Sequence, residues 1–527
     1  MKPNILLSLL FLLIYFNTVA QQNALESINE NDLKAHLEFI ASDYMQGRDF
    51  GTQIPGLEIT ADYLKTQLIK TGLNTVNESY FQKVEMVRVK SDTNNVSIVI
   101  NRNDGSELFH SDGLIDGLNT SENETLKGEI VFAGYGFVDK KTGYNDLEGL
   151  EIKDKIVLIM TRNQKSVIDS LPPNLQNELE FSKFDTIFKL GAKAIITCID
   201  PIVQDKTLYN KVKHSVGKGY VFLDIETIKF FPGTILIASN SLIDNLLKEY
   251  NTTLEQLQKN LNQSGKPKSF LLEGIKANIN LPKKVETIIG KNVIGIIEGS
   301  DPILKNECII LSAHYDHLGM NADDEVFNGA DDNGSGTVAL LEIAEAFTKM
   351  KKTPKRSIVF AWLTAEEHGL FGSDYYSQHP VFPLEKTVVN INLDMIGRVS
   401  NEDSVVNWSN VNSLAAEDGI YIISGKQSSE LTELSNKICK DLNLIPSDSL
   451  TDAFLHRSDY YHFYKNGIPI LGLTTGLHED YHKASDELDK IDYHKMKRVT
   501  VFAFLMANKI ANQKKRIVID NPVFQEK

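Results

Sequence analysis

The segment from Asn292 to Asn512 alternates short apolar runs with amphipathic stretches, and this alternation limits the folds open to the chain. The strand-like runs are Val293–Ile297, Cys308–Ala313, Ile358–Leu363, Val388–Leu393 and Ile468–Leu473. Apolar residues at helical spacing predict helices over Thr337–Met350, Ser429–Leu442 and His494–Asn512. Strands that alternate with helices predict an α/β domain, with a mainly parallel mixed sheet sandwiched by helices.

Polar residues with metal-binding side chains follow these runs. They are His314-Tyr315-Asp316-His317, Glu366-Glu367, Asp394 and the pair His478 and His482, with Ala330-Asp331-Asp332-Asn333 between the second and third runs. Ligands bind beyond the carboxyl ends of strands in open parallel sheets, so we expect these side chains to converge. Histidine and carboxylates without cysteine suit Zn²⁺, and their number exceeds the needs of one catalytic zinc. Two metals that share a bridging carboxylate would use them all.

One segment also matches the motif of a different class of zinc protease. His478-Glu479-Asp480-Tyr481-His482 matches H-E-x-x-H, the helix of single-zinc proteases. That motif needs an amphipathic helix, whereas Thr474-Thr475-Gly476 precedes it and charged residues run through it. We therefore expect a loop here.

The remaining chain has three further parts. Residues 1–20 have Lys2, an apolar core and small residues before Gln21, which predicts a signal peptide, an exported chain in the periplasm or outside the cell, and no membrane span after cleavage. Residues 21–84 predict two helices joined by an exposed turn around Arg48. Residues 85–284 carry short β-type runs and predict a separate β-rich region, before a catalytic part at 285–512 and a tail at 513–527. The net charge of -15, with no basic block, argues against nucleic-acid binding.

Five motifs in order resemble one known family. HYDHLG, GADDNGSG, TAEEHGLFGS, NLDMIGR and TGLHEDYHKASDELDKID are similar to motifs of the di-zinc metallopeptidases of clan MH, which contain aminopeptidases and glutamate carboxypeptidases. Residues 21–84 resemble the helical N-terminal segment of exported bacterial members. The region 85–284 resembles the inserted protease-associated (PA) domain. The resemblance implies a zinc exopeptidase-like catalytic domain, two Zn²⁺ per chain and peptide substrates.

Carried over motif by motif, the resemblance also implies a role for each site residue. The implied metal ligands are His314 and Asp394 for one zinc, Glu367 and His482 for the other, and Asp332 as the bridge. Asp316 would orient His314 from outside the ligand shell, and the Asp332-Asn333 peptide bond would be cis. Glu366 would be the general base toward a metal-activated water. Tyr481 matches a tyrosine that donates a hydrogen bond to the oxyanion in some relatives, and packing of a loop aromatic remains the alternative.

These residues favour an aminopeptidase that removes residues from the free N-terminus of peptides. A carboxypeptidase acting on acidic dipeptides has the same metal motifs. A non-catalytic binding protein on the same scaffold, with a PA domain, would have lost ligands, and none is lost here. A zinc-dependent glutaminyl cyclase would leave part of the ligand set unused. One departure stands out, because relatives commonly carry His in the place of Tyr460. It bears on substrate contacts.

Overall fold

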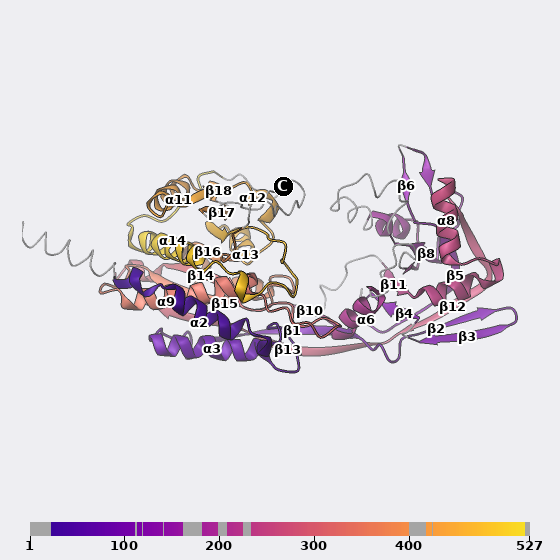
Figure 1. The fold of residues 1–527 in the computed structure, drawn as a ribbon, viewed down its shortest axis with the longest axis horizontal. Helices are drawn as coiled ribbons and strands as arrows, with labels where there is room; N and C mark the ends of the chain where they lie inside the picture. The colour runs from indigo at the N-terminus through magenta and orange to yellow at the C-terminus, as the bar shows by residue number, and fades with distance from the viewer. Residues whose placement is uncertain are drawn as a thin grey trace, which may run out of the picture. The chain divides into compact units, whose positions relative to one another are not determined.

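The computed structural model describes residues 23–110, 113–117, 120–140, 142–161, 182–198, 208–224, 233–399, 418–423 and 425–521. The chain divides into two compact units, the first made of Met1–Glu85 with Ile289–Lys527 and the second of Met86–Ile288 (Figure 1). The predicted signal peptide lies outside the described residues. Within the described part of the chain, no helix has the length and apolar character to cross a membrane.

The first unit is built on a mixed sheet. The strands are β1 (Phe81–Ser91), β13 (Lys283–Ile297), β14 (Cys308–His314), β15 (Ser357–Leu363), β16 (Thr387–Leu393), β17 (Gly419–Ile423), β18 (Ile445–Ser447) and β19 (Ile470–Thr474). Their order is β1-β13-β15-β14-β16-β19-β17-β18. The central pairs β15-β14, β14-β16 and β16-β19 are parallel, whereas β13 and β17 run antiparallel to their inner neighbours.

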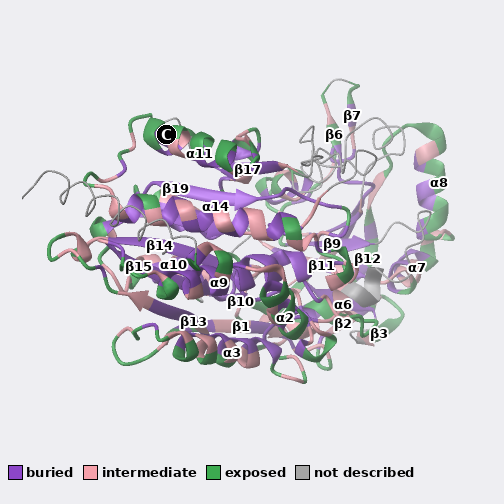
Figure 2. Ribbon diagram, turned by 60° about the vertical axis from the view of Figure 1, so that its left-hand side comes forward, coloured by how far each residue is buried: buried purple, intermediate pink, exposed green. Residues whose placement is uncertain are grey.

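Helices cover both faces of this sheet, which explains why β14, β15 and β16 are buried along their whole length (Figure 2). On one face lie α9 (Gly336–Lys349) and α14 (Tyr493–Asn512), where Phe347 packs against Phe504 with ring centroids 4.7 Å apart. On the other face, α10 (Phe371–Gln378) and α13 (Tyr460–Lys465) share a core with Cys308 and Ile310.

The N-terminal segment belongs to the same unit as the sheet. It forms α2 (Glu30–Ile40), the short η1 (Asp43–Met45) and α3 (Gly56–Thr71), and both α2 and α3 contact α9. The side chain of Asn29 caps the start of α2 by accepting a hydrogen bond from Asp32 N at 3.0 Å.

The structure confirms the α/β class with a mixed sheet between helices. The expected strands at β14, β15 and β16 lie close to their predicted limits, whereas the strand expected at Val293–Ile297 is the end of the longer β13. One expectation about the N-terminal segment was wrong. The turn around Arg48 is not exposed: Arg48 is 0% exposed and Asp49 is 2% exposed. Arg48 can be buried because its guanidinium donates to main-chain oxygens of other segments, and Asp49 because its carboxylate contacts Phe50 N and His368 Nε2.

The second unit has its own sheet, in the order β3-β2-β12-β5-β8-β9-β11-β4. The strands are β2 (Ser97–Arg102), β3 (Gly105–His110), β4 (Leu114–Asp116), β5 (Glu124–Ala133), β8 (Ile156–Met160), β9 (Ala194–Cys198), β11 (Thr234–Ala238) and β12 (Ser269–Leu281). Helices α7 (Asn240–Leu247) and α8 (Leu254–Ser264) pack into its core. The assignment of this unit as a PA domain stays a prediction.

A buried carboxyl on α9 predicts a pH-dependent stability. Burial raises the pKa of Glu342 from 4.5 to about 8, so the folded state keeps a proton that the unfolded state releases. Between these two pH values the free energy of unfolding should fall as pH rises. We expect Glu342→Gln to flatten this slope and to raise the melting temperature at pH 8, measured by thermal unfolding from pH 5 to 9. Glu345→Gln, on the same helix but half-buried, is the control. An unchanged slope in Glu342→Gln would contradict the prediction.

Candidate metal centre

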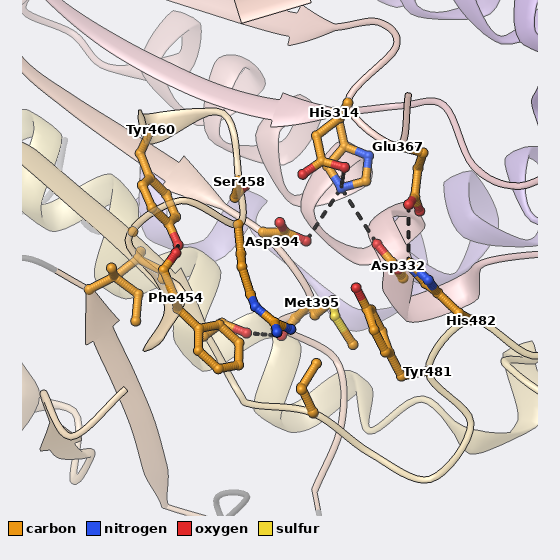
Figure 3. Close-up of a pocket in the computed structure, with 17 residues that line it drawn as sticks. His314, Asp332, Glu367, Asp394, Met395, Phe454, Ser458, Tyr460, Tyr481 and His482 are labelled. Carbon is orange, nitrogen blue, oxygen red and sulfur yellow. Dashed lines mark hydrogen bonds and ion pairs between the residues drawn. The ribbon is translucent and has the colours of Figure 1, made fainter. Parts of the chain in front are cut away.

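The side chains that follow the strands converge at one edge of the sheet (Figure 3). His314 ends β14, Glu366 and Glu367 follow β15, and Asp394 follows β16. His482 arrives on the loop after β19, and Asp332 stands just before α9. All of them line one pocket. The structure thus brings together every residue that the sequence marked as a metal ligand or base.

Asp332 lies between two histidines, one on each of its carboxylate oxygens. His314 Nε2 is 3.5 Å from Asp332 Oδ1 and 3.4 Å from Asp394 Oδ1. His482 Nε2 is 3.2 Å from Asp332 Oδ2 and 3.1 Å from Glu367 Oε2. The result is two adjacent groups of one imidazole and two carboxylates, with Asp332 common to both.

These distances fit metal ligands. Two ligand atoms on a tetrahedral zinc with bonds of about 2.0–2.1 Å lie about 3.3 Å apart. Asp332 Oδ2 and Asp394 Oδ1 are buried, and neither accepts a hydrogen bond of ordinary geometry from the described residues. Buried carboxylate oxygens without donors are costly unless a cation lies against them. The donor set and its orphaned oxygens therefore fit two zinc ions.

The electrostatics of the cluster point the same way. Burial lowers the pKa of His314, but Glu366, Asp394 and Asp332 together hold it well above the usual value. Burial raises the pKa of Glu366 well above its usual value, whereas hydrogen bonds from His317 and His482 hold the pKa of Glu367 well below, against the effect of burial. Neighbouring glutamates therefore have distinct environments, as distinct roles would need.

Asp316 holds the backbone of the two glutamates. Its Oδ1 accepts a hydrogen bond from Glu366 N at 3.1 Å, and its Oδ2 accepts one from Glu367 N at 3.2 Å. His314 Nδ1 lies 3.8 Å from Asp316 Oδ1 and only 3.3 Å from the main-chain oxygen of Asp316. Asp316 thus contacts the glutamate segment more closely than the imidazole that the resemblance pairs with it.

Asp332 is fixed from behind by residues that the sequence reasoning missed. Asp486 Oδ2 accepts hydrogen bonds from Asp331 N and Asp332 N, both at 3.0 Å, and Asp331 Oδ1 accepts one from Gly397 N at 2.7 Å. The Asp332-Asn333 peptide bond is cis. Asp486 lies in the same motif as His482, so its place in the sequence was a usable signal for it.

The loop that carries His478 and His482 is a turn, not a helix, which removes the single-zinc reading of H-E-x-x-H. Asp480 anchors the loop by accepting hydrogen bonds from Arg398 at 2.7 Å, Lys490 at 2.5 Å and Ser485 at 2.7 Å. His478 Nε2 points to Asp331 Oδ2 at 3.3 Å and stays outside the two ligand groups.

His317 also lies at the site. Its Nδ1 is 2.8 Å from Glu367 Oε1 and 3.9 Å from Asp332 Oδ2, and the residue is fully buried. It therefore forms, with Asp332 and Glu367, a further group able to hold a metal. Its position just after Asp316 was the only signal available.

The rest of the pocket is apolar on one side. Met395, Ile423, Phe454 and Leu477 line it beside the acidic cluster. Tyr481 stacks on His482 with ring centroids 3.8 Å apart, and its hydroxyl points toward the cluster (Figure 3). Burial raises the pKa of Tyr481, so the hydroxyl remains a donor at neutral pH.

Two residues near α13 complete the pocket wall. Tyr460 is buried and donates a hydrogen bond to Phe454 O at 2.5 Å. The guanidinium of Arg457 lies over the Phe454 ring, 5.4 Å from its centroid. Arg457 is exposed and forms no ion pair with a carboxylate of the described residues.

Part of the first unit matches a family of known proteins. Residues 292–506 match the model of peptidase family M28. Leucine aminopeptidase 2 of Arthroderma otae is 31% identical over 204 residues, 38% of this chain and 37% of that protein. Aminopeptidase Y of Saccharomyces cerevisiae is 30% identical over 217 residues, 40% of this chain and 35% of that protein. The chain thus spans little more than a third of the length of these relatives.

Solved structures share the fold over most of the chain. An aminopeptidase from Aneurinibacillus sp. strain AM-1 superposes with a TM-score of 0.55 at 19% identity, covering 95% of this chain and 98% of that one. A zinc aminopeptidase from Bacillus subtilis superposes with a TM-score of 0.52 at 17% identity, covering 91% of this chain and 94% of that one. At such identities the likeness establishes the fold.

Proposed function

We propose that this chain is a metallo-aminopeptidase that uses two zinc ions to hydrolyse the N-terminal peptide bond of peptides. The observation that carries the proposal is the shared position of Asp332, whose two oxygens face His314 and His482 at 3.5 and 3.2 Å. His314 and Asp394 would hold one zinc, Glu367 and His482 the other, with Asp332 between them. When bound, zinc supplies Lewis acidity, which lowers the pKa of water and polarises a carbonyl group.

The side chains around the metal ligands supply the other parts of the chemistry. Glu366 Oε2 lies 3.9 Å from His314 Nε2, at the edge of the ligand cluster, and accepts the proton of the attacking water before returning it to the leaving amine. Asp316 fixes the backbone of Glu366 for this task. Tyr481 donates a hydrogen bond to the oxyanion. The apolar wall of Met395, Ile423 and Leu477 receives a substrate side chain.

Three other features remain parts of the proposal. We infer export from the predicted signal peptide at residues 1–20. The similarity of the named relatives, which are aminopeptidases, supports the substrate class. The PA assignment of Met86–Ile288 rests on the motif resemblance, and we assign this unit no chemistry of its own.

Glu366→Gln should abolish turnover without loss of zinc, because it removes the proton acceptor and keeps every ligand. We expect kcat to fall by at least about 10²–10⁴-fold on peptides with free N-termini, with the zinc content unchanged. Glu479→Gln is the matched control, since Glu479 would be the base only in the single-zinc reading and is exposed. Full activity of Glu366→Gln, or loss of activity in Glu479→Gln, would contradict the mechanism. Wild-type protein that binds zinc and cleaves only N-acetylated peptides would contradict the aminopeptidase.

Metal counting should separate His482 from His317. His482 Nε2 faces both Asp332 and Glu367 at metal-ligand spacing, whereas His317 Nδ1 makes a direct hydrogen bond to Glu367. We therefore expect His482→Ala to lose about one of two zinc ions and His317→Ala to keep both, measured as zinc per chain after gel filtration. The reverse pattern would make His317 the ligand.

A second candidate function is favoured by Arg457. This cation lines the pocket without a carboxylate partner among the described residues and is oriented by the Phe454 ring. Such a guanidinium suits a carboxylate of the substrate. The chain would then be a carboxypeptidase acting on acidic dipeptides.

Substrate panels for Arg457→Gln test this candidate. If Arg457 binds a substrate carboxylate, kcat/KM for N-capped acidic dipeptides should fall by about 10-fold relative to kcat/KM for neutral peptides with free N-termini. Lys465→Gln, a charge loss on the exposed side of α13, is the control. Absence of any cleavage of capped acidic dipeptides by the wild type would rule this candidate out and leave the aminopeptidase.

A further inference from the structure

Arg48 lies outside the region that matches the M28 model, yet it contacts the segments that carry the candidate metal ligands. It stands in the loop between η1 and α3 and is fully buried. Its guanidinium donates hydrogen bonds to Tyr315 O at 2.9 Å, Ile40 O at 2.8 Å, Asn328 O at 2.6 Å and Gly329 O at 2.9 Å. A single side chain thus ties the N-terminal helices to two distant segments of the first unit.

Those two segments carry site residues. Tyr315 directly follows His314, and Gly329 stands three residues before Asp332. The main chain of the loop also accepts hydrogen bonds from this segment. His317 N donates to Arg48 O at 3.1 Å, and Gly319 N donates to Gly47 O at 3.0 Å. The loop therefore grips the His314–Gly319 segment through both side chain and backbone.

The packing around Gly47 leaves no room for a side chain at this position. Gly47 has a φ of 69°, and a Cβ there would lie 2.3 Å from Gly319 O and 2.6 Å from Phe327 O. The close approach brings the loop onto the segment between His314 and Asp332.

A third segment of the site meets the same loop. Asp49 Oδ1 lies 2.8 Å from His368 Nε2, and His368 directly follows Glu367. Gly47-Arg48-Asp49 thus contacts the segments that carry His314, Asp332 and Glu367, which come from different parts of the chain.

We propose that Gly47-Arg48-Asp49 is a positioning element of the metal centre, in which Arg48 holds the segments of His314 and Asp332 at the spacing that two zinc ions need. The inference rests on the proposed zinc site. Arg48 acts on the ligands through main-chain carbonyls and touches neither substrate nor metal, and residues 292–506 alone lack this element. Outer groups that orient metal ligands typically carry about 10–100-fold in metal affinity.

Charge adds to this role. Burial lowers the pKa of Arg48 to about 10, so the guanidinium stays protonated at neutral pH. The negative charges of four nearby carboxylates raise the pKa of Arg48, against the effect of burial; they belong to Asp332, Asp486, Asp316 and Glu367. Arg48 thus supplies a fixed positive charge beside the acidic cluster, and this charge remains when the metals are removed.

The chain offers a matched control in Arg356. Arg356 is also buried and donates to Ile510 O at 3.0 Å, Gln513 O at 2.6 Å and the Glu307 carboxylate at 2.7 Å. It precedes β15, at the end of the strand opposite to Glu366. Substitution of Arg356 therefore removes a buried guanidinium with a comparable number of hydrogen bonds at a position away from the proposed metal ligands.

The experiment compares the full-length wild type with Arg48→Met, Arg48→Lys and Arg356→Met. Zinc affinity is measured by competition with a chromogenic chelator, alongside melting temperature, kcat and KM. We expect Arg48→Met to bind zinc about 10–100-fold more weakly than the wild type, and Arg356→Met to stay within about 3-fold. Arg48→Lys keeps the charge but lacks the planar fork, so its zinc affinity should lie between these values. In zinc-loaded Arg48 variants, kcat should fall more than KM rises.

The outcomes separate this inference from the proposed function. Wild-type zinc affinity in both Arg48 variants would overturn the positioning role, and so would an equal loss in Arg356→Met. If Arg48→Met fails to fold, the zinc affinity of Arg48→Lys decides by the same criterion. A wild type that binds no zinc would contradict the proposed function itself.

Discussion

Repulsion between buried carboxylates at the carboxyl ends of the strands constrains the candidate site of the first unit. Asp332, Glu366, Glu367 and Asp394 converge there with two imidazoles between them. Carboxylates taken out of water cost several kcal/mol each unless cations or donors balance them. Most features around the site follow from this requirement, since each neighbouring group either supplies positive charge or fixes the direction in which a carboxylate points.

Three buried aspartates each fix a different segment that carries candidate metal ligands. Asp316 holds the glutamate turn, Asp486 holds the backbone at Asp332, and Asp480 anchors the loop of His482 through Arg398 and Lys490. All three act through main-chain N–H groups or salt bridges, which are rigid once buried. Among the described residues, Asp332 Oδ2 and Asp394 Oδ1 then accept no hydrogen bond of ordinary geometry, as oxygens that face a cation would.

The sequence predicted the parts of this arrangement that depend on local pattern. Apolar runs placed β14, β15 and β16, and the residues after them were correctly expected to meet, because parallel strands end at one edge. The burial of Arg48 was not predictable in this way. Its partners Tyr315, Asn328 and Gly329 lie more than 260 residues away in the sequence. The sequence of a glycine-rich polar loop does not show whether its side chains donate hydrogen bonds to buried carbonyl groups or to water. Asp486 was missed for the same reason, since its role depends on where other segments place their backbone.

The position of the inserted unit explains how so distant a contact survives. The chain leaves the first unit along β1 and returns along β13, and these strands are neighbours in one sheet. An insertion between neighbouring strands fixes its two ends together, so its length adds little to the entropy of closing the loop. The N-terminal helices can therefore pack on α9 as if the chain were continuous. The loop of Arg48 contacts the segments of His314, Asp332 and Glu367 through the side chains of Arg48 and Asp49 and through main-chain hydrogen bonds. Placement of the insertion between these neighbouring strands thus leaves the N-terminal helices and the loop of Arg48 in contact with the rest of the first unit.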